Sequence, residues 1–156
     1  MNNEDIKEKL IKAVKKFIDK DWKKLYKNDI HENTFSHRIA VYLEENFNEY
    51  NVDCEYNKIF GDKKVNKRGE KIRPDIIVHK RDNMNCNKLI IEIKKAGTGS
   101  IEFINDIEKL KKSSNLNYDL GAVIGILKNT IDIVFIKSGN EDRIRLDNKG
   151  NLIKGK

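Results

Sequence analysis

The stretches RPDIIVH (73–79) and IEIKK (91–95) decide the fold and the function that this sequence predicts. Both are apolar runs with the length of a β-strand, and the segment KRDNMNCN between them is rich in the Asp and Asn residues that favour turns. Both also carry charge, at Asp75 in the first run and at Glu92 and Lys94 in the second. Charges inside buried strands require an explanation, because desolvation makes them costly.

These two runs can pair as an antiparallel hairpin that gathers the charges on one face. With the turn centred between Asn83 and Met84, Asp75 lies opposite Glu92. Because side chains alternate between the faces of a strand, Lys94 shares the face of Glu92. The apolar side chains on the opposite face point toward the core: Ile76, Val78, Leu89, Ile91 and Ile93.

Two carboxylates on neighbouring strands repel each other, so this face needs a compensating positive charge. A divalent cation such as Mg²⁺ would supply it, since Mg²⁺ binds carboxylate oxygens, carbonyls and water. An ordinary ion-pair network with Lys94 or Arg73 would also supply it. The convergence of three charged groups on an apolar hairpin favours a functional site, and the ion-pair alternative stays open.

The composition indicates one folded domain without structural staples. The chain has 156 residues, of which 38% are hydrophobic and 37% charged, and a net charge of +7. Clustered lysine binds polyanions such as nucleic acid, although an AT-rich coding sequence would enrich Lys, Asn and Ile in the same way. Cys54 and Cys86 lack the spacing of a zinc site. No apolar run approaches the ~18 residues of a membrane span, so we expect a cytoplasmic protein without a membrane partner.

Apolar residues at helical spacing predict three helices. The first spans residues 3–25, and Asn2 or Asn3 can cap it. The second begins near residues 33–34, and the third begins after Ser100, which can cap it. The predicted apolar stripe of the third helix consists of Ile101, Ile104, Ile107 and Leu110.

Further strands are expected on both sides of the third helix. Residues 52–57 alternate like a half-buried strand, whereas 120–127 and 131–136 are continuous apolar runs typical of buried strands. Residues 61–71 predict a polar loop, and the tail (142–153) can form a final hairpin. The element order predicts an α/β fold in which helices flank a mixed sheet.

The charged hairpin also carries a family resemblance. Pro74-Asp75 followed by Glu92-Ile93-Lys94 resembles the motif of the PD-(D/E)xK nuclease superfamily. The longer string HRIAVYLE…VDCEYNK…RPDIIVHKR…LIIEIKK resembles small, stand-alone bacterial proteins assigned to that superfamily. The resemblance implies a single domain with a restriction-endonuclease-like αβββαβ core over 32–127. A helical extension (1–30) would precede this core, and additional strands (128–156) would follow it.

The resemblance further implies a metal site and the residues that serve it. Asp75 and Glu92 would bind Mg²⁺, for which Mn²⁺ can substitute, together with the backbone carbonyl of Ile93. Asp75, Glu92 and Lys94 would be the catalytic residues. Lys94 would orient the attacking water or stabilise developing charge, because the neighbouring carboxylates oppose a role as a base. Glu32 is a further candidate ligand, and a carboxylate that favours the first turn of a helix explains it equally well.

Basic side chains around the hairpin are candidates for contacts with a nucleic-acid backbone. Several lie in the loop before the Asp75 strand, although such a charge run is usually just solvated. On the third helix, Lys109 could contact phosphate or form an ion pair with Asp106. For Glu55 and His79 we favour polar strand positions over roles in the site. The candidates for nucleic-acid contacts are Lys63, Lys64, Lys67, Arg68, Lys71, Arg73, Lys95 and Lys109.

We therefore expect a Mg²⁺-dependent nuclease that acts on nucleic acid, with DNA favoured over RNA. The alternative is a catalytically silent module with the same fold that binds nucleic acid or a protein partner. The presence of all three motif residues favours the enzyme. Cleavage of both strands of a duplex commonly uses two active sites, which is compatible with a homodimer.

Overall fold

The structure is a computed structural model that describes residues 1–28, 31–55, 58–59, 62–63, 73–113 and 116–153. Its helices are α1 (Asn3–Phe17), α2 (Lys23–Lys27), α3 (Glu32–Asn46) and α4 (Ile101–Lys111), and a π-helical turn (Ile18–Trp22) joins α1 to α2. Its strands are β1 (Asn51–Cys54), β2 (Lys58–Ile59), β3 (Asp62–Lys63), β4 (Ile76–His79), β5 (Leu89–Lys94), β6 (Leu120–Ile126), β7 (Thr130–Lys137) and β8 (Asn140–Asp147).

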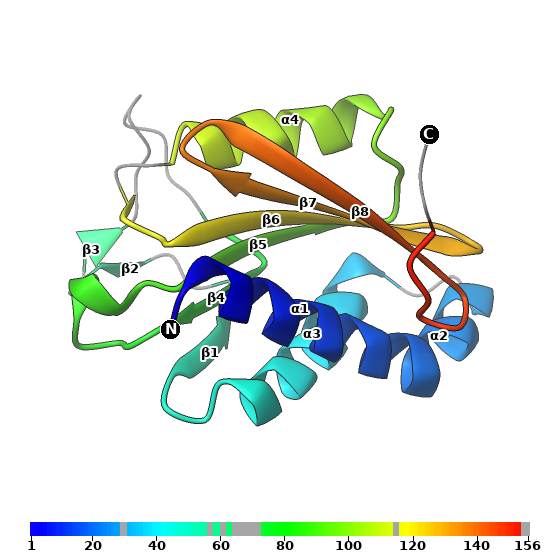
Figure 1. Ribbon diagram of the computed structural model, residues 1–156, viewed down its shortest axis with the longest axis horizontal. Helices are drawn as coiled ribbons and strands as arrows, with labels where there is room; N and C mark the ends of the chain where they lie inside the picture. Colours follow the sequence, from blue (N-terminus) through cyan, green and yellow to red (C-terminus); the bar gives the residue numbers. More distant parts are fainter. Residues whose placement is uncertain (29–30, 56–57, 60–61, 64–72, 114–115, 154–156) are drawn as a thin grey trace.

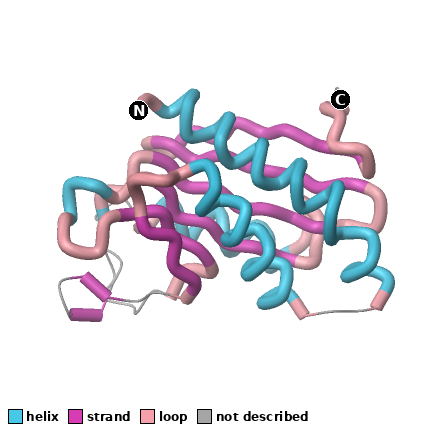
Figure 2. Tube along the Cα trace, turned by 90° about the horizontal axis from the view of Figure 1, so that it is seen from below, coloured by secondary structure: helices cyan, strands magenta, loops and turns pink. Residues whose placement is uncertain are grey.

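A six-stranded sheet with the order β1-β4-β5-β6-β7-β8 forms the middle layer. Helices α1 and α3 cover one face of this sheet and α4 covers the other, as Figure 1 and Figure 2 show. Neighbouring strands are antiparallel, except that β5 and β6 run parallel and are connected through α4. The predicted α/β class, with helices flanking a mixed sheet, is confirmed. The elements α3, β1, β4, β5, α4 and β6 also follow one another in the predicted order.

The N-terminal helical segment has nearly the predicted extent but not a uniform geometry. The side chain of Asn2 accepts a hydrogen bond from the amide of Asp5, and the Asp5 carboxylate accepts one from the Asn2 amide, which completes a capping box. A π-helical turn holds one residue more than an α-helical turn, and both Ile18 and Trp22 are buried there. Beyond this turn the segment continues as α2, which buries no residue.

The two faces of the sheet have separate apolar cores. The larger core lies under α1 and α3, where the rings of Phe17 and Phe35 meet edge to face with centroids 5.8 Å apart. The smaller core lies under α4 and consists of Ile77, Ile90, Phe103, Ile107, Leu110, Val123, Val134 and Ile136. Burial of apolar area thus fixes helices to both faces of the sheet independently.

Two of the four residues predicted to form the buried apolar stripe of α4 are exposed in the structure. Ile101 is 76% exposed and Ile104 is 48% exposed, whereas Ile107 and Leu110 are buried as predicted. Positions three apart are separated by about 300° around a helix, so a stripe with this spacing drifts off the buried face. Phe103, four residues before Ile107, takes the place of the two isoleucines in the core.

Other predicted boundaries also need correction. The second helix begins at Glu32, slightly earlier than predicted. The tail forms the predicted hairpin only as a short antiparallel contact after β8, in which Leu146 bridges to Leu152 and the Ile153 amide donates to the Arg145 carbonyl. Over its whole length β8 also pairs antiparallel with β7, which the sequence did not predict. Ser138 and Gly139, both with positive φ, make the tight turn that directs β8 back onto β7. Of the predicted loop 61–71, only the two residues of β3 lie within the described part of the chain.

Candidate active site

The charged hairpin forms in the predicted register. Strands β4 and β5 pair antiparallel, with Ile77 opposite Ile90. Asp75 immediately precedes β4, and its Oδ2 accepts a hydrogen bond of 2.7 Å from the amide of Ile93. This bond ties Asp75 to the strand that carries Glu92, so the prediction that the two carboxylates face each other across the hairpin is confirmed.

The two faces of the hairpin are divided as the sequence predicted. The five apolar side chains assigned to the core all lie in the cluster under α1 and α3: Ile76, Val78, Leu89, Ile91 and Ile93. Glu92 and Lys94 lie on the other face, where both form ion pairs with α4. Glu92 is only 3% exposed, so its carboxylate is almost fully removed from solvent.

Helix α4 contributes two side chains to this face, and they form cross-linked ion pairs with β5. The Lys109 Nζ atom lies 2.6 Å from Glu92 Oε1. The Lys94 Nζ atom lies 3.6 Å from Asp106 Oδ2, and Asp106 is 6% exposed. Within the described residues no ion pair joins Asp106 to Lys109, because each side chain reaches down to the strand instead. Asp106 is therefore part of the site, which the sequence did not predict.

The environment of Glu92 opposes its ionisation. Burial and the neighbouring charge of Asp75 raise the pKa of Glu92 to about 8, against the opposing influence of Lys109. An acid on this face of the sheet therefore holds its proton more tightly than an acid in water does. Additional positive charge at this position would stabilise the ionised carboxylate.

The same surroundings shift the pKa values of Lys94 and Asp106. Burial is the largest single influence on Lys94 and lowers its pKa, but the charges of the surrounding carboxylates, with Asp106 foremost, outweigh it and leave the pKa above the ordinary value. Burial likewise raises the pKa of Asp106, although Lys94 and Lys109 oppose this. Lys94 therefore carries a positive charge at neutral pH, which suits an orienting or charge-stabilising role better than that of a base.

The chemistry of the donor atoms on this face fits a divalent cation. Glu92 Oε1 and Asp106 Oδ2 are buried oxygens without a well-formed hydrogen bond, and the short contact between Glu92 and Lys109 is a contact of charges with poor hydrogen-bond geometry. In the part of the chain that the structure describes, no three His, Cys, Asp or Glu side chains are placed to hold one metal ion. A cation would therefore depend on Asp75, Glu92 and the Ile93 carbonyl, with water as the remaining ligand.

Glu32 reaches the same end of β5. It is the first residue of α3, and its Oε2 accepts a hydrogen bond of 2.5 Å from the amide of Lys95. Its negative charge also contributes to the raised pKa of Lys94. Both predicted interpretations thus agree with its position, as a first-turn carboxylate of a helix and as an acidic group close to the site.

The candidates for nucleic-acid contacts are dispersed. Arg73 is exposed and lies 3.7 Å from the carboxylate of Glu55, whereas Lys95 Nζ lies 5.1 Å from the centroid of the Tyr26 ring. Lys109 belongs to the ion pairs of the site itself. Lys63 is in β3, with a side chain that the structure does not describe, and the remaining candidates lie outside the described residues: Lys64, Lys67, Arg68 and Lys71.

His79 and Glu55 have structural surroundings, as the sequence favoured. His79 is buried, and its Nε2 lies 2.8 Å from Asp53 Oδ2, while Arg81 donates a 2.9 Å hydrogen bond to the same oxygen. Glu55 follows β1, is exposed and pairs with Arg73.

No protein-family model, curated protein or solved structure matches this chain. None of the helices in the described residues combines the length and the hydropathy needed to span a bilayer. The function must therefore be inferred from the site itself, together with the motif that its residues resemble.

Proposed function

We propose that this protein is a Mg²⁺-dependent nuclease with a restriction-endonuclease-like core of the PD-(D/E)xK superfamily. The observation that carries the proposal is the hairpin, in which Asp75 and Glu92 face each other and Lys94 lies on the same face. The order of the elements α3, β1, β4, β5, α4 and β6 supports the αβββαβ core. The net charge of +7 supports a polyanionic substrate, with DNA favoured.

In this proposal Asp75, Glu92 and the carbonyl of Ile93 hold the cation. The chemistry that Mg²⁺ supplies in such a site is a polarised phosphate and a bound water of lowered pKa. The hydrogen bond from the Ile93 amide fixes one carboxylate oxygen of Asp75, so that the other oxygen remains available as a ligand. The buried position of Glu92 keeps competing water away from its carboxylate.

Lys94 acts on the phosphate or on the attacking water. Its ammonium group is charged, and Asp106 on α4 holds it from the side opposite the hairpin. From this position it orients the water or stabilises the negative charge that develops on the phosphate oxygens in the transition state. Asp106 is a positioning residue in this scheme, because it acts through Lys94.

One observation favours the alternative of a catalytically silent binding module. The 2.6 Å contact between Lys109 and Glu92 supplies positive charge to the site from the protein itself. A module of this kind would bind nucleic acid or a protein partner equally well with and without metal. The presence of Asp75, Glu92 and Lys94 together favours the enzyme over this alternative.

The two functions are distinguished by incubating the protein with plasmid, linear, single-stranded and branched DNA and with RNA, in Mg²⁺, Mn²⁺ or EDTA. We expect cleavage that requires metal and that falls by about 100-fold or more in Asp75→Ala and Glu92→Ala. The matched control is Asp82→Ala, which removes an exposed carboxylate between β4 and β5. Cleavage that survives in EDTA or in Asp75→Ala would contradict the proposal, and metal-independent binding without cleavage would favour the silent module.

A further inference from the structure

A second feature of the molecule is a pocket of about 680 Å³ between the N-terminal helical segment and two turns of the sheet. Its floor is formed by Ile18, Trp22 and Tyr26 of the π-helical turn and α2. Its rim carries four lysines, two from α2, one from the β6–β7 turn and one from the turn after β8: Lys23, Lys27, Lys128 and Lys149. We refer to it as the lysine-rimmed pocket.

The lysine-rimmed pocket lies at the same end of the sheet as the candidate active site, although its floor packs on the α1 and α3 face and Glu92 and Lys94 lie on the α4 face. Because β5 and β6 are parallel, with Lys94 paired to Gly125, both strands end at this edge. Lys95, the residue after β5, places its Nζ atom 5.1 Å from the ring centroid of Tyr26, which lines the pocket. Lys128 follows shortly after β6. Figure 1 shows α2, the β6–β7 turn and the end of β8 together at this end of the molecule.

The charge of the pocket is suited to an anion. Four lysines surround it and a single carboxylate, that of Asp19, lies among its lining residues. The Asp19 carboxylate is 3.9 Å from the ammonium of Lys20, outside the rim. Within the described part of the chain, none of the four rim lysines forms an ion pair through its ammonium group. Their charges are therefore available to phosphate groups.

The floor of the pocket is suited to a flat aromatic ligand. Trp22 is 3% exposed, and its Nε1–H is a buried donor that lacks a hydrogen-bond partner among the described residues. Tyr26 is half-buried beside it. An apolar, aromatic floor next to lysines matches the two halves of a nucleotide, because bases stack on aromatic rings and phosphates bind ammonium groups. π-Helical turns are also found frequently at functional sites.

We propose that the lysine-rimmed pocket binds one unpaired nucleotide of the substrate strand, close to the phosphate that is cleaved. The base would lie against the half-buried ring of Tyr26, above the buried side chains of Ile18 and Trp22. The flanking phosphates would lie among the rim lysines. A base inside a duplex is stacked and paired and cannot enter such a pocket without unpairing. We therefore expect the protein to prefer substrates with a single-stranded segment, such as a flap or an overhang. This expectation rests on the proposed nuclease function.

The test uses the full chain and the fluorescence of Trp22, which is the single tryptophan of the sequence. In EDTA, which prevents cleavage, a short oligothymidylate is titrated into the protein and compared with a blunt duplex of the same length and with thymidine monophosphate. We expect saturable quenching by the single strand, about 10-fold or more tighter than by the duplex or by the mononucleotide. Equal or tighter binding of the duplex would overturn the proposal. Equal or tighter binding of the mononucleotide would overturn it too, because the pocket would then serve a free nucleotide.

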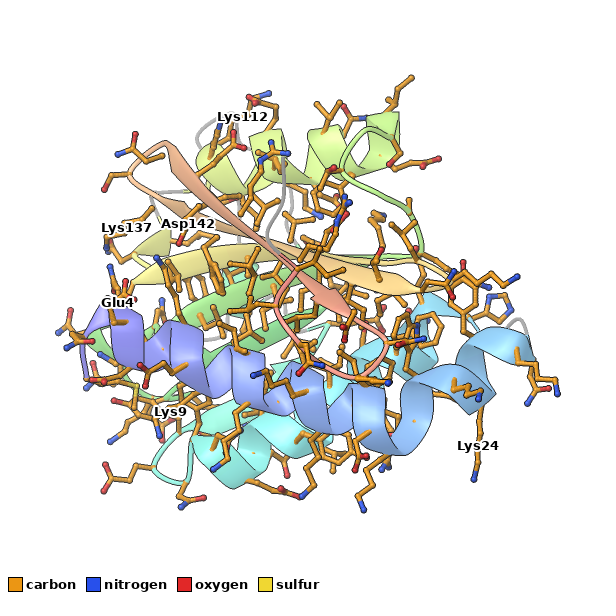
Figure 3. The ribbon with its side chains drawn as sticks, turned by 45° about the vertical axis from the view of Figure 1, so that its right-hand side comes forward. Glu4, Lys9, Lys24, Lys112, Lys137 and Asp142 are labelled. Atoms are coloured by element: carbon orange, nitrogen blue, oxygen red, sulfur yellow. The ribbon has the colours of Figure 1, made fainter. Side chains whose placement is uncertain are left out.

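Charge reversal on the rim provides the second part of the test. Lys23→Glu with Lys27→Glu should weaken binding of the single strand and lower the slope of log affinity against log salt by about one for each lysine that contacts a phosphate. The matched control is Lys24→Glu on the same helix, since Lys24 is exposed, does not line the pocket and points away from the sheet (Figure 3). Equal losses in both variants would overturn the proposal.

If the first pair of substitutions disturbs α2, the two lysines on the opposite wall of the pocket provide an independent variant, Lys128→Glu with Lys149→Glu.

The possible outcomes distinguish a failure of the pocket proposal from a failure of the nuclease proposal. Metal-dependent cleavage without quenching of Trp22 would overturn the pocket and leave the nuclease proposal intact. Quenching by single strands without cleavage of any substrate would support the pocket and count against the nuclease.

Discussion

Replacement of Glu92 by glutamine should stabilise the metal-free protein at neutral pH, although it removes a proposed catalytic residue. The Glu92 carboxylate is 3% exposed and faces Asp75, and its pKa is raised from the ordinary value of 4.5 to about 8. The folded state therefore favours the protonated acid. Glutamine has nearly the same shape and is neutral at every pH, so it avoids the cost of burying the negative charge.

The sign and size of the effect follow from the pKa of Glu92 in the two states. Since the folded pKa is above the unfolded one, the contribution of Glu92 to stability is fully present below pH 4.5 and is lost as the pH rises through about 8. At about 1.4 kcal/mol per pH unit, the loss amounts to about 3 kcal/mol at pH 7. The difference in the free energy of unfolding between Glu92→Gln and the native protein should therefore increase by this amount, in favour of the variant, between pH 4.5 and pH 7.

Urea denaturation in EDTA at a series of pH values measures this difference directly. Glu49→Gln, which replaces an exposed carboxylate with no ion pair among the described residues, serves as the matched control. Addition of Mg²⁺ should raise the free energy of unfolding of the native protein more than that of the Glu92→Gln variant, because a ligand stabilises the state that binds it. A constant stability difference between Glu92→Gln and the native protein from pH 4.5 to 8 would refute the reasoning.

Two further predictions concern α4. Asp106→Asn should reduce metal-dependent cleavage by about 10- to 100-fold, because it weakens the ion pair that positions Lys94. It should not lower the melting temperature, because it also removes a buried charge. An unchanged cleavage rate would exclude the positioning role. Gly125→Ala should lower the free energy of unfolding by about 1–3 kcal/mol, because the added Cβ would collide with the backbone oxygen of Ala96 and would lie 2.7 Å from Phe103 Cε2. Gly99→Ala, where a Cβ meets nothing within 4 Å, is the control in the same denaturation experiment.

The hairpin was predictable because its geometry is local. A strand repeats every two residues, so one turn position fixes which side chain faces which over the whole pair. The facing of Asp75 and Glu92 and the division of the faces follow from that register, and the structure confirms both. The N-terminal capping box is local in the same sense, since Asn2 and Asp5 are three residues apart.

The contacts of α4 were not predictable, because they depend on how the helix is rotated about its axis. Phe103 determines that rotation by packing into the core, and it turns Asp106 and Lys109 toward the sheet. A sequence pattern that counted Ile101 and Ile104 as buried placed this face wrongly. The signal that could have found Asp106 was its position three residues after the buried Phe103, on the same side of the helix.

The lysine-rimmed pocket was invisible in the sequence for a different reason. Its rim brings together α2, the β6–β7 turn and the turn after β8, which are far apart along the chain. In the sequence, Trp22 and Tyr26 alone do not form a pattern typical of single-strand binding. Only the ending of β5 and β6 at one edge of the sheet brings these segments close to the proposed site.

The π-helical turn separates two roles that one continuous helix would have to combine. Before the turn, α1 buries five residues, and substitutions there affect the core. After the turn, α2 buries no residue fully. Its Leu25 and Tyr26 pack against the core, whereas its three lysines are exposed. Mutations of these lysines can therefore alter what the pocket accepts at little cost in stability. The specificity of this protein could thus diverge between relatives while the sheet and the charged hairpin stay the same.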